Sequence, residues 1–182
     1  VLHRKGWGRQ NVTGLRRGWE SLTNLDTRDP ASVKRYVVPL NKENTSTIDR
    51  TGGTWLHTTR TNPRKMKQTA GDGSISTVDL TPRVMENVAQ LELDYLVAIG
   101  GDDTLSYAAH LDRLGVKVVA VPKTMDNDVR NTEYCIGFST AITRAMDAIE
   151  RQRTTIASHE RTGVFRIFGR DAGFSALYTA YV

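Results

Sequence analysis

The sequence predicts an α/β fold built on a parallel sheet, because a strand-helix-strand pattern lies near its centre. The apolar run at residues 93–99 predicts a buried strand, residues 103–113 a helix, and the apolar run at 116–121 a second strand. A crossover of this kind is right-handed in nearly all proteins and makes its two strands parallel. Both strands end in acidic loops, and ligands of open α/β sheets bind at the carboxyl ends of the strands. We therefore expect the functional site at this edge.

The first part of the chain predicts short elements separated by loops. Strand patterns occupy residues 12–16 and 36–40, and Pro39 favours an edge position for the second strand. Gly, Thr and Asn residues predict a structured loop at 51–63 and a turn at 71–73.

The remaining elements follow from helical spacing and apolar runs. A helix is expected to start at Thr81 with a proline in its first turn, and a long helix to run from a cap at Ser139 to about residue 157. A strand at 164–168 and a helix at 172–181 complete the expected order.

Composition indicates an ordinary soluble protein. Of 182 residues, 38% are hydrophobic and 25% charged, and no apolar run reaches the length of a membrane span. Cys135 is the only cysteine, so no intrachain disulfide forms and a cytoplasmic location is the default. The net charge of +5 comes from dispersed basic residues, which favours small phosphorylated substrates over nucleic acid.

The loop GGDDT follows the first central strand. Gly100 and Gly101 allow backbone N–H groups to approach an anion at a helix N-terminus, and Thr104 completes the loop. Asp102 and Asp103 need a reason to lie beside phosphate, and Mg²⁺ bridging carboxylate and phosphate oxygens supplies it. The alternative is that Asp103 merely caps the helix, although capping does not explain the glycine pair.

The loop PKTMDND follows the second central strand. Asp126 and Asp128 alternate with Asn127, so in an extended loop they point the same way. One carboxylate can accept a proton from a sugar hydroxyl while its neighbour serves the metal. Lys123 is the cation that balances charge on a transferring phosphoryl group. An Asx-rich surface turn is the alternative interpretation.

Three arginines are further candidates for contacts with phosphate. Arg60 follows two threonines in a Gly-rich loop, although a solvated arginine is equally ordinary there. Arg170, in FGRDAG, comes just after an expected strand, and Arg161 lies in a more ambiguous polar connector. The four histidines have no metal-ligand spacing. The acidic loops, the lysine and the glycines together predict magnesium-assisted phosphoryl transfer.

In this order and spacing, the segments GGTWLHTTR, IGGDDT, PKTMDND and FGRDAG resemble the phosphofructokinases, from about Gly14 to the last residue. Members of that family often carry GGDGS and PGTIDND, and the departures at Asp103 and Lys123 resemble its pyrophosphate-dependent branch. The resemblance implies a three-layer, Rossmann-like parallel sheet truncated at both ends. Residues 1–138 would be the phosphate-donor domain without its first strand and glycine loop, and 139–182 a connecting helix and the start of the sugar-phosphate domain.

The resemblance also implies a role for each motif residue. Asp102 resembles the magnesium ligand and Asp126 the general base on the sugar 1-hydroxyl. Asp103 would crowd and repel a nucleotide α-phosphate. Lys123 and Arg170 would act on the transition state. The donor-phosphate residues would be Gly100, Gly101, Asp103, Thr104 and Arg60; the sugar-phosphate residues would be Thr124, Met125, Asp126, Asp128, Arg161, Phe168, Gly169 and Arg170.

The expected activity is transfer of a phosphoryl group from pyrophosphate to fructose 6-phosphate with Mg²⁺, giving fructose 1,6-bisphosphate. Phe168 stands where the family commonly has methionine, and Arg161 resembles an arginine given across a subunit interface, which implies a homo-oligomer. The chain alone is expected to be inactive, with no nucleic-acid or membrane partner. The alternatives are an ATP-dependent phosphofructokinase and a non-catalytic phosphate-binding module.

Overall fold

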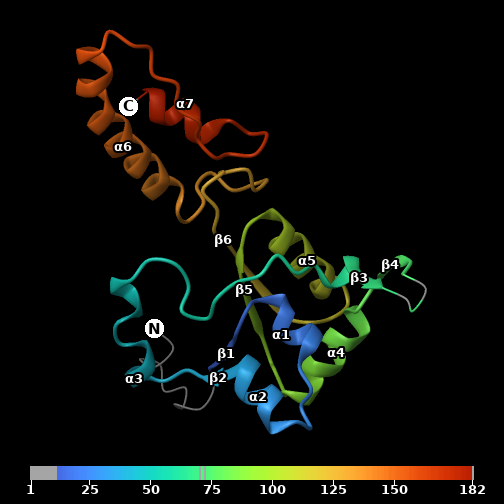
Figure 1. Ribbon diagram of the computed structural model, residues 1–182. Coiled ribbons are helices and arrows are strands. Elements are labelled where there is room, and N and C mark those ends of the chain that lie inside the picture. The colour runs from blue at the N-terminus through green and yellow to red at the C-terminus, as the bar shows by residue number, and fades with distance from the viewer. Residues whose placement is uncertain (1–11, 70, 72, 182) are drawn as a thin grey trace. The chain divides into compact units, whose positions relative to one another are not determined.

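The computed structural model describes residues 12–69, 71 and 73–181, which belong to two compact units (Figure 1). The first unit is Val1–Asp94 and the second is Tyr95–Val182. Helices and strands alternate along the chain, so the predicted α/β class is confirmed. The division expected at residue 138 concerns which substrate each part binds, and it stays a prediction.

The first unit combines two antiparallel strand pairs with short helices. Strand β1 (Thr13–Leu15) pairs with β2 (Val37–Pro39), which confirms the two predicted strands, and β3 (Met66–Thr69) pairs with β4 (Ile75–Val78). The helical elements are α1 (Trp19–Asn24), α2 (Pro30–Tyr36), α3 (Lys42–Thr45), the 3₁₀ helices Ile48–Arg50 and Pro63–Lys65, and α4 (Thr81–Gln90).

The β3–β4 hairpin was not predicted from the sequence. Its strand residues are mostly exposed and polar, so they lack the apolar alternation that signals a half-buried strand. The turn expected at 71–73 falls between the two strands, although Asp72 lies outside the described residues.

Helix α4 is joined to the end of α1 by a buried asparagine. The Asn87 Nδ2 donates to the carbonyl oxygens of Leu22 (3.0 Å) and Leu25 (3.1 Å), and Arg83 donates to Leu25 as well (2.9 Å). The last carbonyls of a helix have no partner within the helix, so these side chains satisfy the end of α1. Leu22 and Val84 are fully buried beside them.

The second unit contains the predicted strand-helix-strand. Strand β5 (Leu96–Gly100), helix α5 (Asp102–Arg113) and strand β6 (Val118–Pro122) follow one another, and the two strands are parallel. Leu96 and Ala98 are buried on the face of the sheet that α5 covers with Tyr107 and Leu111. Val97, Ile99 and Val119, which alternate with the buried positions, are exposed.

Two long helical segments complete the second unit. Helix α6 (Phe138–Ser158) and helix α7 (Phe174–Tyr181) pack against each other, with the rings of Phe138 and Tyr178 edge to face at 5.6 Å. The predicted extent of both helices is therefore confirmed to within two residues at each end.

Two local predictions in this unit are wrong. Ser139 does not cap α6: the cap position is Gly137, whose positive φ of 98° suits a residue without Cβ, and Ser139 lies inside the first turn. Residues 164–168 form no strand but an exposed connector, with Val164 92% exposed. A strand needs a neighbour for its N–H and C=O groups, and none of the strands in the described part of the chain pairs with this segment.

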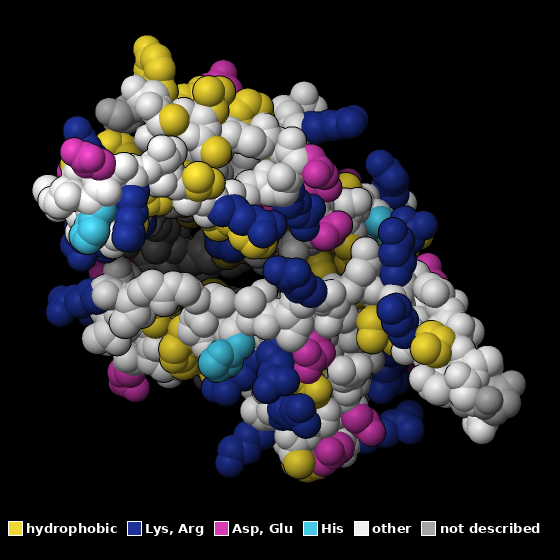
Figure 2. Space-filling view, turned by 45° about the horizontal axis from the view of Figure 1, so that its top comes forward, with side chains coloured by type: hydrophobic (Ala, Val, Ile, Leu, Met, Phe, Trp, Pro, Cys, Tyr) yellow, Lys and Arg dark blue, Asp and Glu magenta, His cyan; other side chains and the backbone are white. Residues whose placement is uncertain are grey.

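The surface carries basic side chains in a scattered pattern. Figure 2 shows Lys and Arg side chains spread over the visible face among hydrophobic ones. Of the helices that the structure describes, none combines the length and the apolar character needed to cross a bilayer.

Candidate functional site

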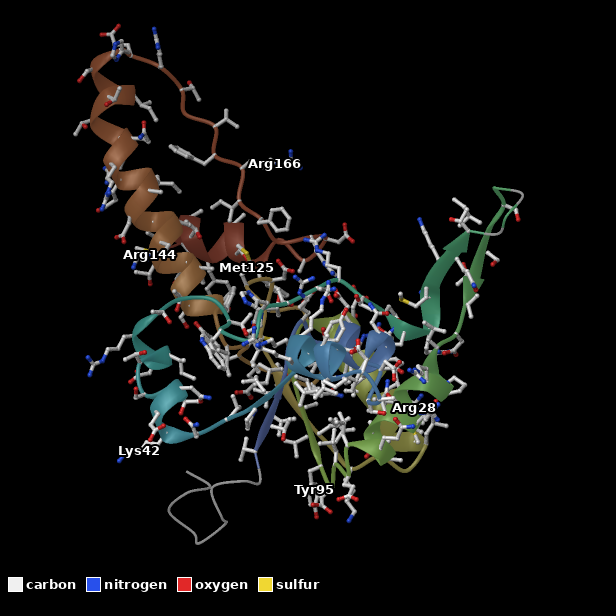
Figure 3. The ribbon with its side chains drawn as sticks, turned by 60° about the horizontal axis from the view of Figure 1, so that its bottom comes forward. Arg28, Lys42, Tyr95, Met125, Arg144 and Arg166 are labelled. Atoms are coloured by element: carbon white, nitrogen blue, oxygen red, sulfur yellow. The ribbon has the colours of Figure 1, made fainter. Side chains whose placement is uncertain are left out.

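The parallel pairing of β5 with β6 brings the two acidic loops to one edge. Gly100 lies opposite Pro122 in the register, and the Lys123 N–H donates to the Gly100 carbonyl oxygen at 2.8 Å. The GGDDT and PKTMDND loops therefore leave the sheet side by side. Tyr95, labelled in Figure 3, lies at the opposite end of β5.

The tight join between β5 and α5 explains the first glycine. A Cβ on Gly100 would come within 2.7 Å of Thr104, so the first turn of α5 packs directly on the end of the strand. A Cβ on Gly101 would meet only Thr124 at 3.7 Å, an ordinary contact. Packing alone therefore explains why residue 100 is glycine. The expected approach of phosphate to Gly100 and Gly101 stays a prediction.

The two aspartates of this loop occupy the first turn of α5. Both are exposed, and neither caps the helix, because the cap position Gly101 precedes them and no side-chain cap hydrogen bond forms. The alternative that Asp103 is merely a cap is therefore wrong. Its Oδ2 instead accepts a hydrogen bond from Arg170 Nη2 at 3.3 Å.

The loop after β6 holds Asp126 in a buried position. Asp126 is 8% exposed, its N–H donates to Thr124 Oγ1 at 3.1 Å, and its Oδ1 is buried without a hydrogen-bond partner in the described structure. A buried carboxylate oxygen is costly to leave unpaired. Asp126 therefore keeps an unused acceptor oxygen in the described structure, and its role as the general base stays a prediction.

The expectation of an extended loop around Asp126 and Asp128 is wrong. Asn127 has a φ of 52°, in the left-handed region, so the chain bends between the two aspartates. The Asn127 side chain fixes the bend: Oδ1 accepts from Cys135 N–H at 2.8 Å and Nδ2 donates to Glu133 O at 3.1 Å. Asn127 thus holds the loop that carries Asp126.

Arg170 connects the two loops electrostatically. Its Nη2 lies 3.3 Å from Asp103 Oδ2, and its Nε lies 3.9 Å from Asp126 Oδ2. The hydrogen bond and the charge of Asp103, with smaller effects of Asp128 and Asp126, raise the pKa of the Arg170 guanidinium. The Arg170 backbone has a φ of 48°, an uncommon conformation for a residue with a Cβ.

The start of α7 is tied to the same loop. Ser175 is buried, and its Oγ donates to the Met125 carbonyl oxygen at 2.8 Å. Figure 3 shows Met125 beside the beginning of α7, and Gly169 is buried against Ser175. The FGR segment therefore lies beside the PKTMDND loop, which agrees with the resemblance to the phosphofructokinases, whereas their shared role in binding a sugar phosphate stays a prediction.

Further predicted site residues are Lys123, Phe168, Arg161 and Arg60. Lys123 is exposed at the edge and has no side-chain partner among the described residues, and Phe168 is 68% exposed. Arg161 follows α6, whose 21 residues span about 30 Å, so it lies beyond the end of the helix that is distant from the loop. Arg60 is an exposed residue of the first unit.

Two positioning residues were missed in the sequence. Asn127 looked like a spacer between carboxylates, and its preference for left-handed backbone was the available signal. Ser175 carried no signal, because its bond to Met125 joins residues 50 positions apart.

The chemistry of the site fits a substrate-bound Mg²⁺ better than a protein cage. No group of three His, Cys, Asp or Glu side chains gathers as metal ligands within residues 12–69 and 73–181. Mg²⁺ is usually held by one or two carboxylates together with substrate phosphates and water. The exposed Asp102, which makes no ion pair in the described structure, fits that role.

Comparison with known proteins identifies the family. The phosphofructokinase family model matches residues 2–182, so the chain belongs to the phosphofructokinase family. It is 40% identical over 167 residues to the pyrophosphate–fructose 6-phosphate 1-phosphotransferase of Dictyoglomus thermophilum, covering 92% of this chain and 42% of that protein. It is 34% identical over 168 residues to ATP-dependent 6-phosphofructokinase 3 of Bacteroides thetaiotaomicron, with 92% and 46% coverage.

A solved structure shows the same fold. Pichia pastoris phosphofructokinase in the T-state superposes with a TM-score of 0.71 at 23% identity, covering 92% of this chain and 16% of that one. The predicted α/β fold of the phosphofructokinase type is thereby confirmed. The chain spans less than half the length of the curated relatives described above.

The two glycines of the GGDDT loop should respond differently to alanine. Gly100→Ala forces the Thr104 side chain and α5 away from β5, and overpacking of this kind costs about 1–3 kcal/mol of unfolding free energy. Gly101→Ala finds ordinary contacts, so its cost is limited to the poorer N-cap that alanine makes, about 0.5–1 kcal/mol. Urea unfolding of both variants measures the difference, and equal losses would contradict the steric account.

Proposed function

We propose that this chain supplies the donor and acceptor loops of an enzyme that transfers a phosphoryl group from pyrophosphate to the 1-hydroxyl of fructose 6-phosphate. The observation that carries the proposal is the position of Arg170, 3.3 Å from Asp103 in one loop and 3.9 Å from Asp126 in the other. A donor loop and an acceptor loop that share one guanidinium lie close enough for direct transfer between their ligands. The family membership and the Dictyoglomus relative support the same reaction.

Charge supports pyrophosphate as the donor. Asp103 is 77% exposed at the start of α5, where a nucleotide donor would bring an additional α-phosphate. Two like charges 4 Å apart repel by about 1 kcal/mol in a watery environment, which corresponds to about a fivefold difference in rate. The charge of Asp103 alone therefore favours pyrophosphate over ATP only modestly. The bulk of Asp103 and the cation of Lys123 have to contribute the rest of the preference.

The acceptor chemistry falls to Asp126. Its carboxylate takes the proton of the sugar 1-hydroxyl as that oxygen bonds to a phosphorus of pyrophosphate, and the bond from this phosphorus to the bridging oxygen breaks. The products are fructose 1,6-bisphosphate and inorganic phosphate. Lys123 and Arg170 stabilise the negative charge on the transferring group, which is the main protein contribution to phosphoryl transfer.

The remaining residues bind and orient the two substrates. Asp102 would hold Mg²⁺, which when bound neutralises phosphate charge. Gly100, Gly101, Thr104 and Arg60 are proposed for the donor phosphates. The proposed sugar-phosphate residues are Thr124, Met125, Asp128, Phe168, Gly169, Arg170 and Arg161, the last across a subunit interface in a cytoplasmic homo-oligomer.

An ATP-dependent phosphofructokinase is the second candidate. The relative from Bacteroides thetaiotaomicron, at 34% identity, favours it, since that protein is named as ATP-dependent.

Residues 1–182 alone are proposed to be inactive. Phosphoryl transfer depends on positioning and electrostatic stabilisation by groups on all sides of the two substrates, so the complete site is required.

Replacing Asp103 and Lys123 together should shift the preference for the phosphoryl donor towards ATP. In a full-length enzyme that contains this chain, Asp103→Gly with Lys123→Gly should raise the ratio of kcat/KM for ATP to that for pyrophosphate by about tenfold. The change removes the repelling carboxylate and the cation that serves the smaller donor. The measurement is fructose 1,6-bisphosphate formation with each donor, and residues 1–182 alone serve as the inactive control. Faster turnover with ATP in the unmutated enzyme would contradict the proposal.

Removing the proposed base should affect turnover more than sugar binding. In the same enzyme, Asp126→Asn should lower kcat by about 10²–10⁴-fold, the usual contribution of general-base assistance, and leave KM for fructose 6-phosphate within a few-fold. The matched control is Asp94→Asn, an exposed aspartate next to the opposite end of β5, which should be silent. A near-normal kcat for Asp126→Asn would remove Asp126 from the role.

A further inference from the structure

We propose that Asp103 is a positioning residue for Arg170 as well as a residue that selects the donor. The inference deepens the proposed function and rests on it, because Arg170 matters through the sugar phosphate and the transferring group. Asp103 then also affects the binding of the sugar phosphate on the acceptor side of the site, an effect that selection of the donor alone would not produce.

The contacts of Arg170 carry the inference. Among the described residues, Asp103 is the only hydrogen-bond partner of the Arg170 side chain, at 3.3 Å. The Asp126 carboxylate lies at 3.9 Å from Nε, within ion-pair range but too far for a hydrogen bond. Asp103 therefore makes the shortest of the described contacts that orient the guanidinium over the PKTMDND loop.

The backbone around Arg170 leaves the side chain in need of such an anchor. Residues 160–173 contain no helix or strand, and Arg170 itself has a φ of 48°. The backbone on either side is held, since Gly169 is buried and Ser175 donates to Met125. The backbone of Arg170 is thus held by packing on either side, whereas its charged end is oriented mainly by the hydrogen bond to Asp103.

The effect concerns position rather than stability. The Asp103 side chain is 77% exposed and the Arg170 side chain 52% exposed, and exposed ion pairs contribute little to folding. An arginine fixed before the substrate arrives loses less conformational freedom on binding, which increases affinity. Asp103 therefore strengthens binding of the sugar phosphate although it carries the same sign of charge as that ligand.

The direction of the change in affinity for fructose 6-phosphate distinguishes positioning of Arg170 by Asp103 from a purely electrostatic effect of its charge. Binding of fructose 6-phosphate to the full-length enzyme is measured by calorimetry with no donor present. Asp103→Ala removes both the negative charge and the acceptor of the Arg170 hydrogen bond. It should tighten binding of an anion if Asp103 acts only through its field. If Asp103 positions Arg170, the same change weakens binding by about threefold or more.

Three further variants make the test specific. Asp103→Glu keeps the charge and should restore most of the affinity. In an Arg170→Gln background, Asp103→Ala should have no additional weakening effect, because the group that it positions is gone. Asp112→Ala removes an exposed carboxylate from the same helix and should leave binding unchanged. Unchanged or tighter binding by Asp103→Ala would overturn the inference.

A second readout does not depend on the proposed function. In the 182-residue chain, the ¹⁵N resonances of the Arg170 guanidinium should show slowed rotation, lost in Asp103→Ala and kept in Asp112→Ala. Free rotation in the unmutated chain would overturn the inference even if pyrophosphate is the donor. Slowed rotation in this chain, together with failure of the full-length enzyme to bind fructose 6-phosphate, would refute the proposed function and leave the ion pair as an anchor for Arg170.

Discussion

The parallel pairing of β5 with β6 is the constraint on which the site depends. It ends at Gly100 and Pro122, and the hydrogen bond from Lys123 N–H to Gly100 O continues it by one residue into the loops. Beyond that point the chain forms a loop whose far end returns to the end of β6, because Ile136 N–H donates to Pro122 O and Thr124 N–H donates to Ile136 O. The loop with Asp126 is therefore fixed at both ends by backbone bonds, and the GGDDT loop begins beside it.

The charges of the site are arranged around this edge in a consistent way. Asp102 and Asp103 lie in the first turn of α5, where the helix dipole stabilises negative charge. The same carboxylates would repel a phosphorylated ligand unless cations are present, and Arg170 and Lys123 are cations that the described second unit provides at this edge. The arrangement is compatible with the proposed binding of phosphate together with Mg²⁺.

The sequence was most informative where local pattern and burial agree. The strand-helix-strand at Leu96–Pro122 was predicted because buried apolar runs alternate with a helix, and both acidic loops were located through it. The strand expected at residues 164–168 shows the limit: its composition suits a strand, but pairing depends on a neighbour that composition does not reveal. The bend at Asn127 was misjudged for a related reason, since spacing alone does not give backbone conformation.

The contact between Asp103 and Arg170 could not be predicted from pattern, because it joins residues 67 positions apart through exposed side chains. The individual residues were identified, whereas their pairing required the structure.

We propose that this site takes its phosphoryl group from pyrophosphate rather than from ATP. A competition experiment supplies the full-length enzyme with fructose 6-phosphate, Mg²⁺ and equal concentrations of ³²P-labelled pyrophosphate and [γ-³³P]ATP, and follows both labels into fructose 1,6-bisphosphate. If pyrophosphate is the donor, ³²P predominates in the product. Predominant ³³P would show instead that ATP is the donor.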